Sequence, residues 1–379
     1  MAYPFCFSGA PIVGVEMRSR FIPVLVLLAL LASQPDTLSA EDRVNAAERK
    51  VPRQLLGLLH APEVHTELGL SASQITELEK QFQVVDGRWF RARIEPPTAN
   101  LLIMQELEES MNRWLSNHFS DVQRQRLTEL ELQAQGTRVL LRGDVADRLS
   151  FSEKQKSDLL RMASETDEAV TAYQQSLRQG KDDTTLKATV QEKQKSERDA
   201  IYTVLTESQR AELGELLGEK FHTAGLTRIY PMAPDFSPSA DWLNSPALSL
   251  KQLRGKVVLV HFYAFQCHNC QANFDVYRRW HDRFGDDVVV VGIQTPETPD
   301  ERRRDRVAAA VKLDDFKFPV IFDAASEHWK TWGNTMWPTV YVIDKKGYLR
   351  RWWQGELRWK GADTDQQLES LIEDLIEES

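Results

Sequence analysis

Cysteine is scarce in this chain of 379 residues, which contains three cysteines. So small a number excludes a scaffold held together mainly by disulfide bonds. An excess of basic charge is also lacking, because 47 lysines and arginines compare with 56 aspartates and glutamates, for a net charge of −9. A general nucleic-acid-binding protein is usually basic, so we expect no nucleic-acid partner.

The chain also lacks an apolar run long enough to span a membrane. The run from Phe21 to Ala32 has twelve residues, whereas a transmembrane helix needs about 20. Arg18 and Arg20 precede this run and Leu38-Ser39-Ala40 follows it, which is the layout of a secretory signal. We therefore expect residues 1–40 to be a signal peptide that exports the protein to the periplasm or another extracytoplasmic space. Contact with the membrane is expected only through this segment, if it stays uncleaved.

The region from residue 41 to about 225 is predicted to be an all-helical domain. It is rich in Leu, Gln, Glu, Arg, Lys and Ala, with apolar residues three and four positions apart. Four sites have Ser or Thr followed three positions later by Gln, the pattern of a capping box that starts a helix. These boxes are Ser71 with Gln74, Ser120 with Gln123, Ser152 with Gln155, and Thr206 with Gln209.

The boxes recur at a long interval, which indicates an internal duplication. The third box follows the first by 81 positions, and the fourth follows the second by 86. Each copy has one interruption, at Pro96-Pro97 and at 180–183, so we predict two similar helical hairpins. The run from Leu205 to Gln209 resembles the repeats of periplasmic helical proteins of the Spy/CpxP type. A plain helical bundle with good caps explains the same pattern.

The composition changes near residue 225, where a second domain is predicted. Four prolines between Pro231 and Pro246 predict a linker and lead-in over 226–249. Over 250–379, β-rich runs alternate with helical runs, which predicts an α/β domain with a mixed sheet. The expected strands are 257–264, 288–293, 318–322, 339–343 and 348–353, and the expected helices are 271–284, 302–313, 326–332 and 365–376.

The candidate reactive group is the sequence Cys267-His268-Asn269-Cys270. It follows a predicted strand and opens a predicted helix, where two cysteines at this spacing share a face and are close enough to bond. A structural zinc site needs two more ligands, and no second cysteine pair is present. The helix start favours an anion at Cys267, so we expect a lowered pKa there and a resolving thiol at Cys270. An inert structural disulfide is the alternative.

The sequence around the cysteines resembles the redoxin branch of the thioredoxin superfamily, in particular the TlpA-like group of exported thiol–disulfide oxidoreductases. The resemblance covers residues 231–378 and rests on Ala233-Pro234-Asp235-Phe236, the run 253–260, Trp332-Gly333-Asn334 and Trp337-Pro338, besides the cysteines. It implies a thioredoxin fold in which Pro338 is cis and faces the cysteines, with Trp337 lining the contact surface. It also implies protein dithiols or disulfides as substrates, a periplasmic electron donor or acceptor, and no bound cofactor.

Two positions depart from this family. Gln266 replaces the tryptophan that usually precedes the first cysteine, and His261 replaces the aspartate six positions before it in thioredoxins. His261 could relay protons to Cys270, or it could be a hydrogen-bonded core residue. His268, between the cysteines, could stabilise a thiolate when charged, or it could be solvated.

Two other functions fit parts of the sequence. A peroxiredoxin-type peroxidase needs Thr or Ser three positions before its reactive cysteine and Pro seven before, where this chain has Ala264 and Val260. A helical binding or chaperone-like module that carries a redox domain is compatible with the first interpretation. Metal binding by His60, His65 and His118 is not expected, because scattered helix histidines are usually solvated.

We predict that the exported chain is cleaved near Ala40, whether translation starts at Met1 or at Met17. N-terminal sequencing of periplasmic material should begin close to Glu41. A mature protein that begins at either methionine would contradict the signal interpretation.

Overall fold

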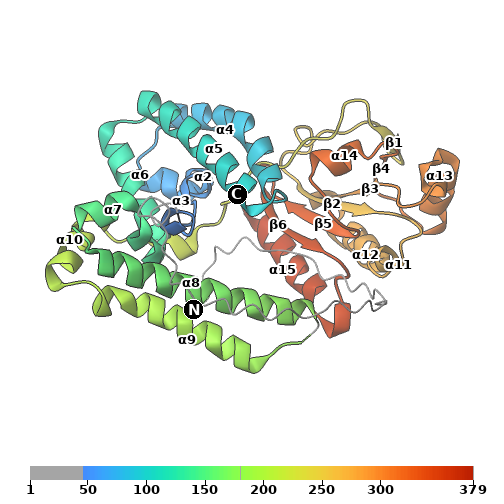
Figure 1. Ribbon diagram of the computed structural model, residues 1–379. Coiled ribbons are helices and arrows are strands. Elements are labelled where there is room, and N and C mark those ends of the chain that lie inside the picture. The colour runs from blue at the N-terminus through green and yellow to red at the C-terminus, as the bar shows by residue number, and fades with distance from the viewer. Residues whose placement is uncertain (1–45, 180, 379) are drawn as a thin grey trace, which may run out of the picture. The chain divides into compact units, whose positions relative to one another are not determined.

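Figure 1 shows the protein as a computed structural model, which describes residues 46–179 and 181–378. The predicted signal segment and its cleavage site lie outside these ranges. Within them, no helix is both long and apolar enough to cross a membrane.

The N-terminal region is helical, as predicted. Its long helices are α4 (Ala72–Ala92), α5 (Pro97–His118), α6 (Asp121–Ala134), α8 (Glu153–Arg178), α9 (Thr184–Thr203) and α10 (Glu207–Leu217). The shorter elements are α2 (Leu55–His60), α3 (Pro62–Glu67), η1 (Gly136–Leu141), α7 (Gly143–Arg148) and η2 (Thr223–Gly225). Pro97 begins α5, where its missing N–H group costs no helical hydrogen bond. Figure 1 shows α8 and α9 side by side as an antiparallel pair.

The four capping boxes form, and their glutamines also bond to one another. In each box the hydroxyl accepts from the Gln backbone N–H, and the Gln side chain accepts from the N–H of the cap residue. Gln74 donates to Gln123 at 2.9 Å, and Gln155 donates to Gln209 at 2.7 Å. Gln123 and Gln209 each donate to the carbonyl oxygen three residues before the other box of their pair. The two pairs of boxes are therefore joined by equivalent bonds.

The described residues form two compact units, which do not follow the predicted domain ranges. One unit contains 46–54 and 126–223, and the other contains 55–125 together with 224–378. The predicted helical domain over 41–225 is thus divided between them. The reason is visible in the second unit, where Phe90 of α4 is buried in the same apolar cluster as Trp332 and Tyr341.

The C-terminal sheet has six strands in the order β1-β4-β3-β2-β5-β6. They are β1 (Asp241–Leu243), β2 (Val257–Tyr263), β3 (Val288–Gln294), β4 (Val320–Phe322), β5 (Thr339–Ile343) and β6 (Leu349–Gln354). β2, β3 and β4 run parallel, and the other pairs are antiparallel. This mixed sheet, flanked by helices, is the predicted thioredoxin fold.

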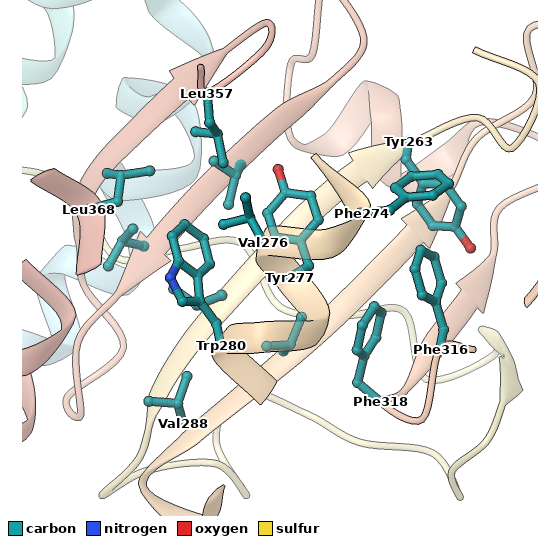
Figure 2. Close-up of a cluster of buried hydrophobic side chains, with 14 of the residues drawn as sticks. Tyr263, Phe274, Val276, Tyr277, Trp280, Val288, Phe316, Phe318, Leu357 and Leu368 are labelled. Atoms are coloured by element: carbon teal, nitrogen blue, oxygen red, sulfur yellow. The ribbon is translucent and has the colours of Figure 1, made fainter. Parts of the chain in front are cut away.

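Alternate residues of β2 supply the cores on the two faces of the sheet. Val257, Leu259 and Tyr263 point into one cluster with α12 (Phe274–Phe284), α13 (Arg304–Leu313) and α15 (Thr364–Glu377). Figure 2 shows part of this cluster, with Tyr277 and Trp280 on α12 beside the strands. The intervening residues of β2 point into the second cluster, which contains Phe90. All of β2 is buried, which explains its nearly continuous apolar sequence.

Two details of the C-terminal prediction were wrong. The predicted linker over 226–249 contains β1, which pairs with β4, and the buried core residue Phe236. The helix expected over 271–284 is interrupted: α11 (His268–Gln271) ends before α12 begins at Phe274. The remaining short elements are α14 (Glu327–Thr331) and the 3-10 turns η3 (Gly285–Asp287), η4 (Asp300–Arg302) and η5 (Trp359–Gly361).

We predict that Ser152→Ala lowers the free energy of unfolding by about 1 kcal/mol, because the cap of α8 loses its side-chain acceptor. Chemical denaturation monitored by circular dichroism measures the change. Ser157→Ala is the matched control, since Ser157 is exposed inside the same helix and alanine is a better helix former there. Equal effects of the two substitutions would show that the cap contributes nothing.

Candidate active site

The two cysteines lie at the junction of β2 and α11, in different environments. Cys267 is the N-cap residue of α11 and is partly exposed, whereas Cys270 is fully buried. The carbonyl of Cys267 accepts from the N–H groups of Cys270 and Gln271, which fixes the turn between the sulfurs. Both cysteines are free thiols in this structure.

This arrangement moves the pKa values of the two thiols in opposite directions. The pKa of Cys267 is lowered, chiefly because its sulfur accepts a hydrogen bond from the Cys270 thiol, with backbone N–H groups of Cys270 and Asn269 adding to the effect. Desolvation and the Glu297 carboxylate oppose that shift. The pKa of Cys270 is raised, first by burial and then by its bond to Cys267. Because α11 has four residues, these specific donors, rather than the dipole of a long helix, stabilise the thiolate.

Trp337 and Pro338 lie beside this junction. The register of the sheet pairs Phe262, near the end of β2, with Thr339, the first residue of β5. The segment before β5 is thereby placed next to the segment that leads to Cys267. The Trp337–Pro338 peptide bond is cis, and Trp337 stacks on Trp329 with 4.1 Å between ring centroids.

His261 lies in the core behind the cysteines and is fully buried. Its ring stacks on Tyr277 at 4.1 Å and on Tyr263 at 5.0 Å between centroids. Among the described residues, neither ring nitrogen has a hydrogen-bond partner, so the expected hydrogen-bonded core histidine is a stacked one instead. Burial lowers the pKa of His261 to about 3. The ring is then neutral at the pH of most assays, which favours packing over proton relay. His268 is exposed.

Glu301, which no sequence pattern indicated, holds the loop in front of Cys267. This carboxylate is fully buried in η4. One oxygen accepts from the N–H of Gln266 at 2.7 Å, and the other accepts from Glu297 and Thr298 at 2.8 and 2.9 Å. Glu301 therefore connects the residue before Cys267 to the loop after β3, which carries Glu297. Its complete burial is visible only in the fold.

Two of the three helix histidines, His60 and His65, are not the solvated residues that the sequence suggested. His60 is buried, with one ring nitrogen bonded to the carbonyl oxygen of Leu56 and the other to the carboxylate of Asp86. His65 is also buried, and its ring bonds to the carbonyl oxygen of Leu59. His118 is exposed. In the described ranges, no group of three or more His, Cys, Asp or Glu side chains is arranged to hold a metal ion.

We predict that His261 makes the fold less stable in acid. The unfolded chain takes up a proton at this residue below about pH 6.5, while the folded chain does so only near pH 3. Stability contributed by the neutral ring is therefore lost as the pH falls from 6.5 towards 3. Between pH 7.5 and 4.5 the His261→Phe protein should lose about 2–3 kcal/mol less unfolding free energy than the wild type.

The control for that comparison is Phe262→Leu, on the other face of the same strand. It removes buried apolar volume without a titrating group, so it should lower stability by a similar amount at both pH values. Denaturant titrations at the two pH values give the unfolding free energies of the wild type and both variants. A His261→Phe protein with the wild-type pH dependence would contradict the lowered pKa.

Known proteins that resemble this chain include a family matched by its C-terminal region. Residues 230–352 match the AhpC/TSA family. Protein DipZ of Mycobacterium tuberculosis is 35% identical over 136 residues, which are 35% of this chain and 20% of DipZ. Thiol-disulfide oxidoreductase YkuV of Bacillus subtilis is 25% identical over 122 residues, covering 32% of this chain and 82% of YkuV.

Among solved structures, a putative thiol:disulfide interchange protein DsbE from Chlorobium tepidum is 20% identical. The match covers 38% of this chain and 95% of the DsbE chain, with a TM-score of 0.33. The chain thus spans about a fifth of the length of DipZ, and the matched stretch is 35% of this chain. Over residues 230–352 the chain is therefore similar in sequence to the AhpC/TSA family.

Proposed function

We propose that this chain is an exported thiol–disulfide oxidoreductase that exchanges electrons with the cysteines of other proteins. The observation that carries the proposal is the unequal pair at the start of α11. Cys267 is accessible and has a lowered pKa, whereas Cys270 is buried and has a raised pKa. An attacking thiol needs access and thiolate character, and a resolving thiol needs neither until the first bond has formed.

In the reducing direction, the Cys267 thiolate attacks one sulfur of a partner disulfide. A bond forms between Cys267 and that sulfur, and the partner's other sulfur leaves as a thiolate and takes up a proton. The Cys270 thiol then loses its proton and attacks the Cys267 sulfur, which releases the second partner thiol. Two electrons pass from the pair to the partner, and an external dithiol must restore the reduced pair. The reverse sequence oxidises a partner dithiol, and neither direction needs a bound cofactor.

The surroundings of Cys267 suit a protein substrate. Trp337 is partly exposed beside it, and the segment before β5 offers backbone groups next to the sulfur. Export, which rests on the signal-like N-terminus, would place this chemistry in the periplasm, where protein disulfides form. A periplasmic thiol donor or acceptor would then be the second partner.

Peroxide reduction is a weaker candidate. A peroxiredoxin-type site needs a hydroxyl three residues before the reactive cysteine, where Ala264 is fully buried among apolar side chains. Val260, seven residues before the cysteine, is buried as well. Nothing at these positions can donate to a bound peroxide.

We predict that Cys267 is the sulfur that attacks. The Cys270→Ser protein, mixed with insulin, should accumulate a mixed disulfide on Cys267, because no second thiol remains to release the partner. Non-reducing electrophoresis with mass spectrometry identifies the attachment site. In the wild-type dithiol, iodoacetamide at pH 6 should label Cys267 at least about tenfold faster than Cys270.

The matched variant is Cys267→Ser, which should form no adduct with insulin. Adducts on Cys270 in this variant, with none in the Cys270→Ser protein, would reverse the two roles. The direction of electron flow follows from the reduction potential of the pair. A value near about −270 mV suits a reductant, and one near about −120 mV suits an oxidant.

A further inference from the structure

The end of α4 contacts the turn that leads to Trp337. Arg93, the C-cap residue of α4, directs its guanidinium group into this turn. The group donates to the carbonyl oxygen of Trp332, to that of Gly333 at 3.2 Å, and to the Tyr341 hydroxyl at 2.9 Å. The partners are 239 to 248 positions away in the sequence. A helix of the N-terminal region thus reaches the redox domain within one compact unit.

Arg93 is itself held in place by its own helix. Its guanidinium carbon lies 3.6 Å from the centre of the Phe90 ring, and one nitrogen donates to the Phe90 carbonyl. The planar group can serve several acceptors at once, which a lysine ammonium cannot do in the same geometry. The next residue, Ile94, approaches Gly333 so closely that a side chain there would meet it at 3.1 Å. Gly333 also has a φ of +54°, so this approach depends on glycine.

The contacts continue from Arg93 towards the cysteines. The Tyr341 hydroxyl accepts from Arg93 and donates to the side-chain oxygen of Asn334 at 2.6 Å. The backbone N–H of Asn334 donates to the carbonyl of Trp329 at 3.0 Å. Trp329 stacks on Trp337 at 4.1 Å. Arg93 therefore holds the middle of the 329–337 segment, and the tryptophan stack joins its two ends.

We propose that Arg93 is a positioning residue for the redox site, which makes the first helical hairpin a working part of the oxidoreductase. It holds the 332–334 turn, and so keeps the backbone before β5 at the place where a protein substrate lies against Cys267. This proposal rests on the proposed function. Arg93 does not contact either sulfur, so it acts on how a protein disulfide is held and leaves the thiolate chemistry of Cys267 unchanged.

The Arg93→Met protein tests this separation, with dithiothreitol as reductant and the full chain as enzyme. We expect kcat/KM for insulin to fall about tenfold, mostly through a higher KM, because the substrate-facing backbone is no longer fixed. The rate of Cys267 alkylation by iodoacetamide should stay within about twofold of the wild type, since a small reagent does not need that backbone. Arg93→Lys should recover part of the lost kcat/KM by keeping the charge and one donor.

The control is Arg91→Gln, two residues earlier on α4. Arg91 is exposed and donates to the carbonyl of Gly87 in its own helix, so its loss should leave kcat/KM unchanged. If Arg93→Met does not fold, Tyr341→Phe decides alone. It removes the hydroxyl between Arg93 and Asn334, and it should lower kcat/KM for insulin about threefold without changing alkylation.

Three results would overturn the proposal. Unchanged insulin kinetics in Arg93→Met, or in Tyr341→Phe if that variant alone folds, would leave Arg93 with a role in stability only. A parallel fall in insulin reduction and in alkylation would place the effect on the Cys267 thiolate. A wild-type chain that neither reduces insulin nor oxidises a protein dithiol would remove the proposed function itself, and the positioning role with it.

Discussion

The site is built on one contact, from the buried Cys270 thiol to the partly exposed Cys267 sulfur. The bond lowers the pKa of Cys267, and burial followed by the same bond raises the pKa of Cys270. The two sulfurs come together because Cys267 is the N-cap residue of α11 and Cys270 lies three positions later, on the buried side of the same helix.

Glu301 and Arg93 support the junction from two sides. Glu301 binds the backbone before Cys267 through a buried carboxylate with three N–H donors, and Arg93 binds the turn before Trp337 through a guanidinium group. Both use a charged group to satisfy several backbone groups at once, and charge-assisted bonds of this kind are stronger than neutral ones. They constrain loops, where apolar packing alone specifies position poorly.

Local sequence patterns predicted most of the helices and strands, but they did not predict the contacts of Glu301 and Arg93. The capping boxes, the strands of the sheet and the cysteine motif are each contained in short windows with a period or spacing that physical chemistry explains. Glu301 and Arg93 bind residues that are 35 and 239 positions away in the sequence. Nothing in the local sequence distinguishes either residue from the charged residues around it. β1 was missed for a related reason: a three-residue strand among prolines has too little pattern, and its pairing with β4 supplies what the sequence lacks. For His261 the sequence left a proton relay and a hydrogen-bonded core residue open, because the aromatic rings that surround it in the described residues come from distant positions.

The two helical segments that contain the first and third capping boxes make different contacts. Asp86 and Asp167 occupy positions 81 apart, the spacing of the first and third capping boxes. Asp86 is buried, where it contacts His60 and accepts from the backbone N–H of Met232, at the entry to the redox domain. Asp167 is 45% exposed and pairs with Lys50 and Arg138 inside its own unit. A buried carboxylate with a backbone partner fixes a chain segment, whereas an exposed ion pair contributes little to position or stability. The segment with Asp86 therefore contacts the chain that leads into the sheet, and Asp167 pairs with residues of its own unit.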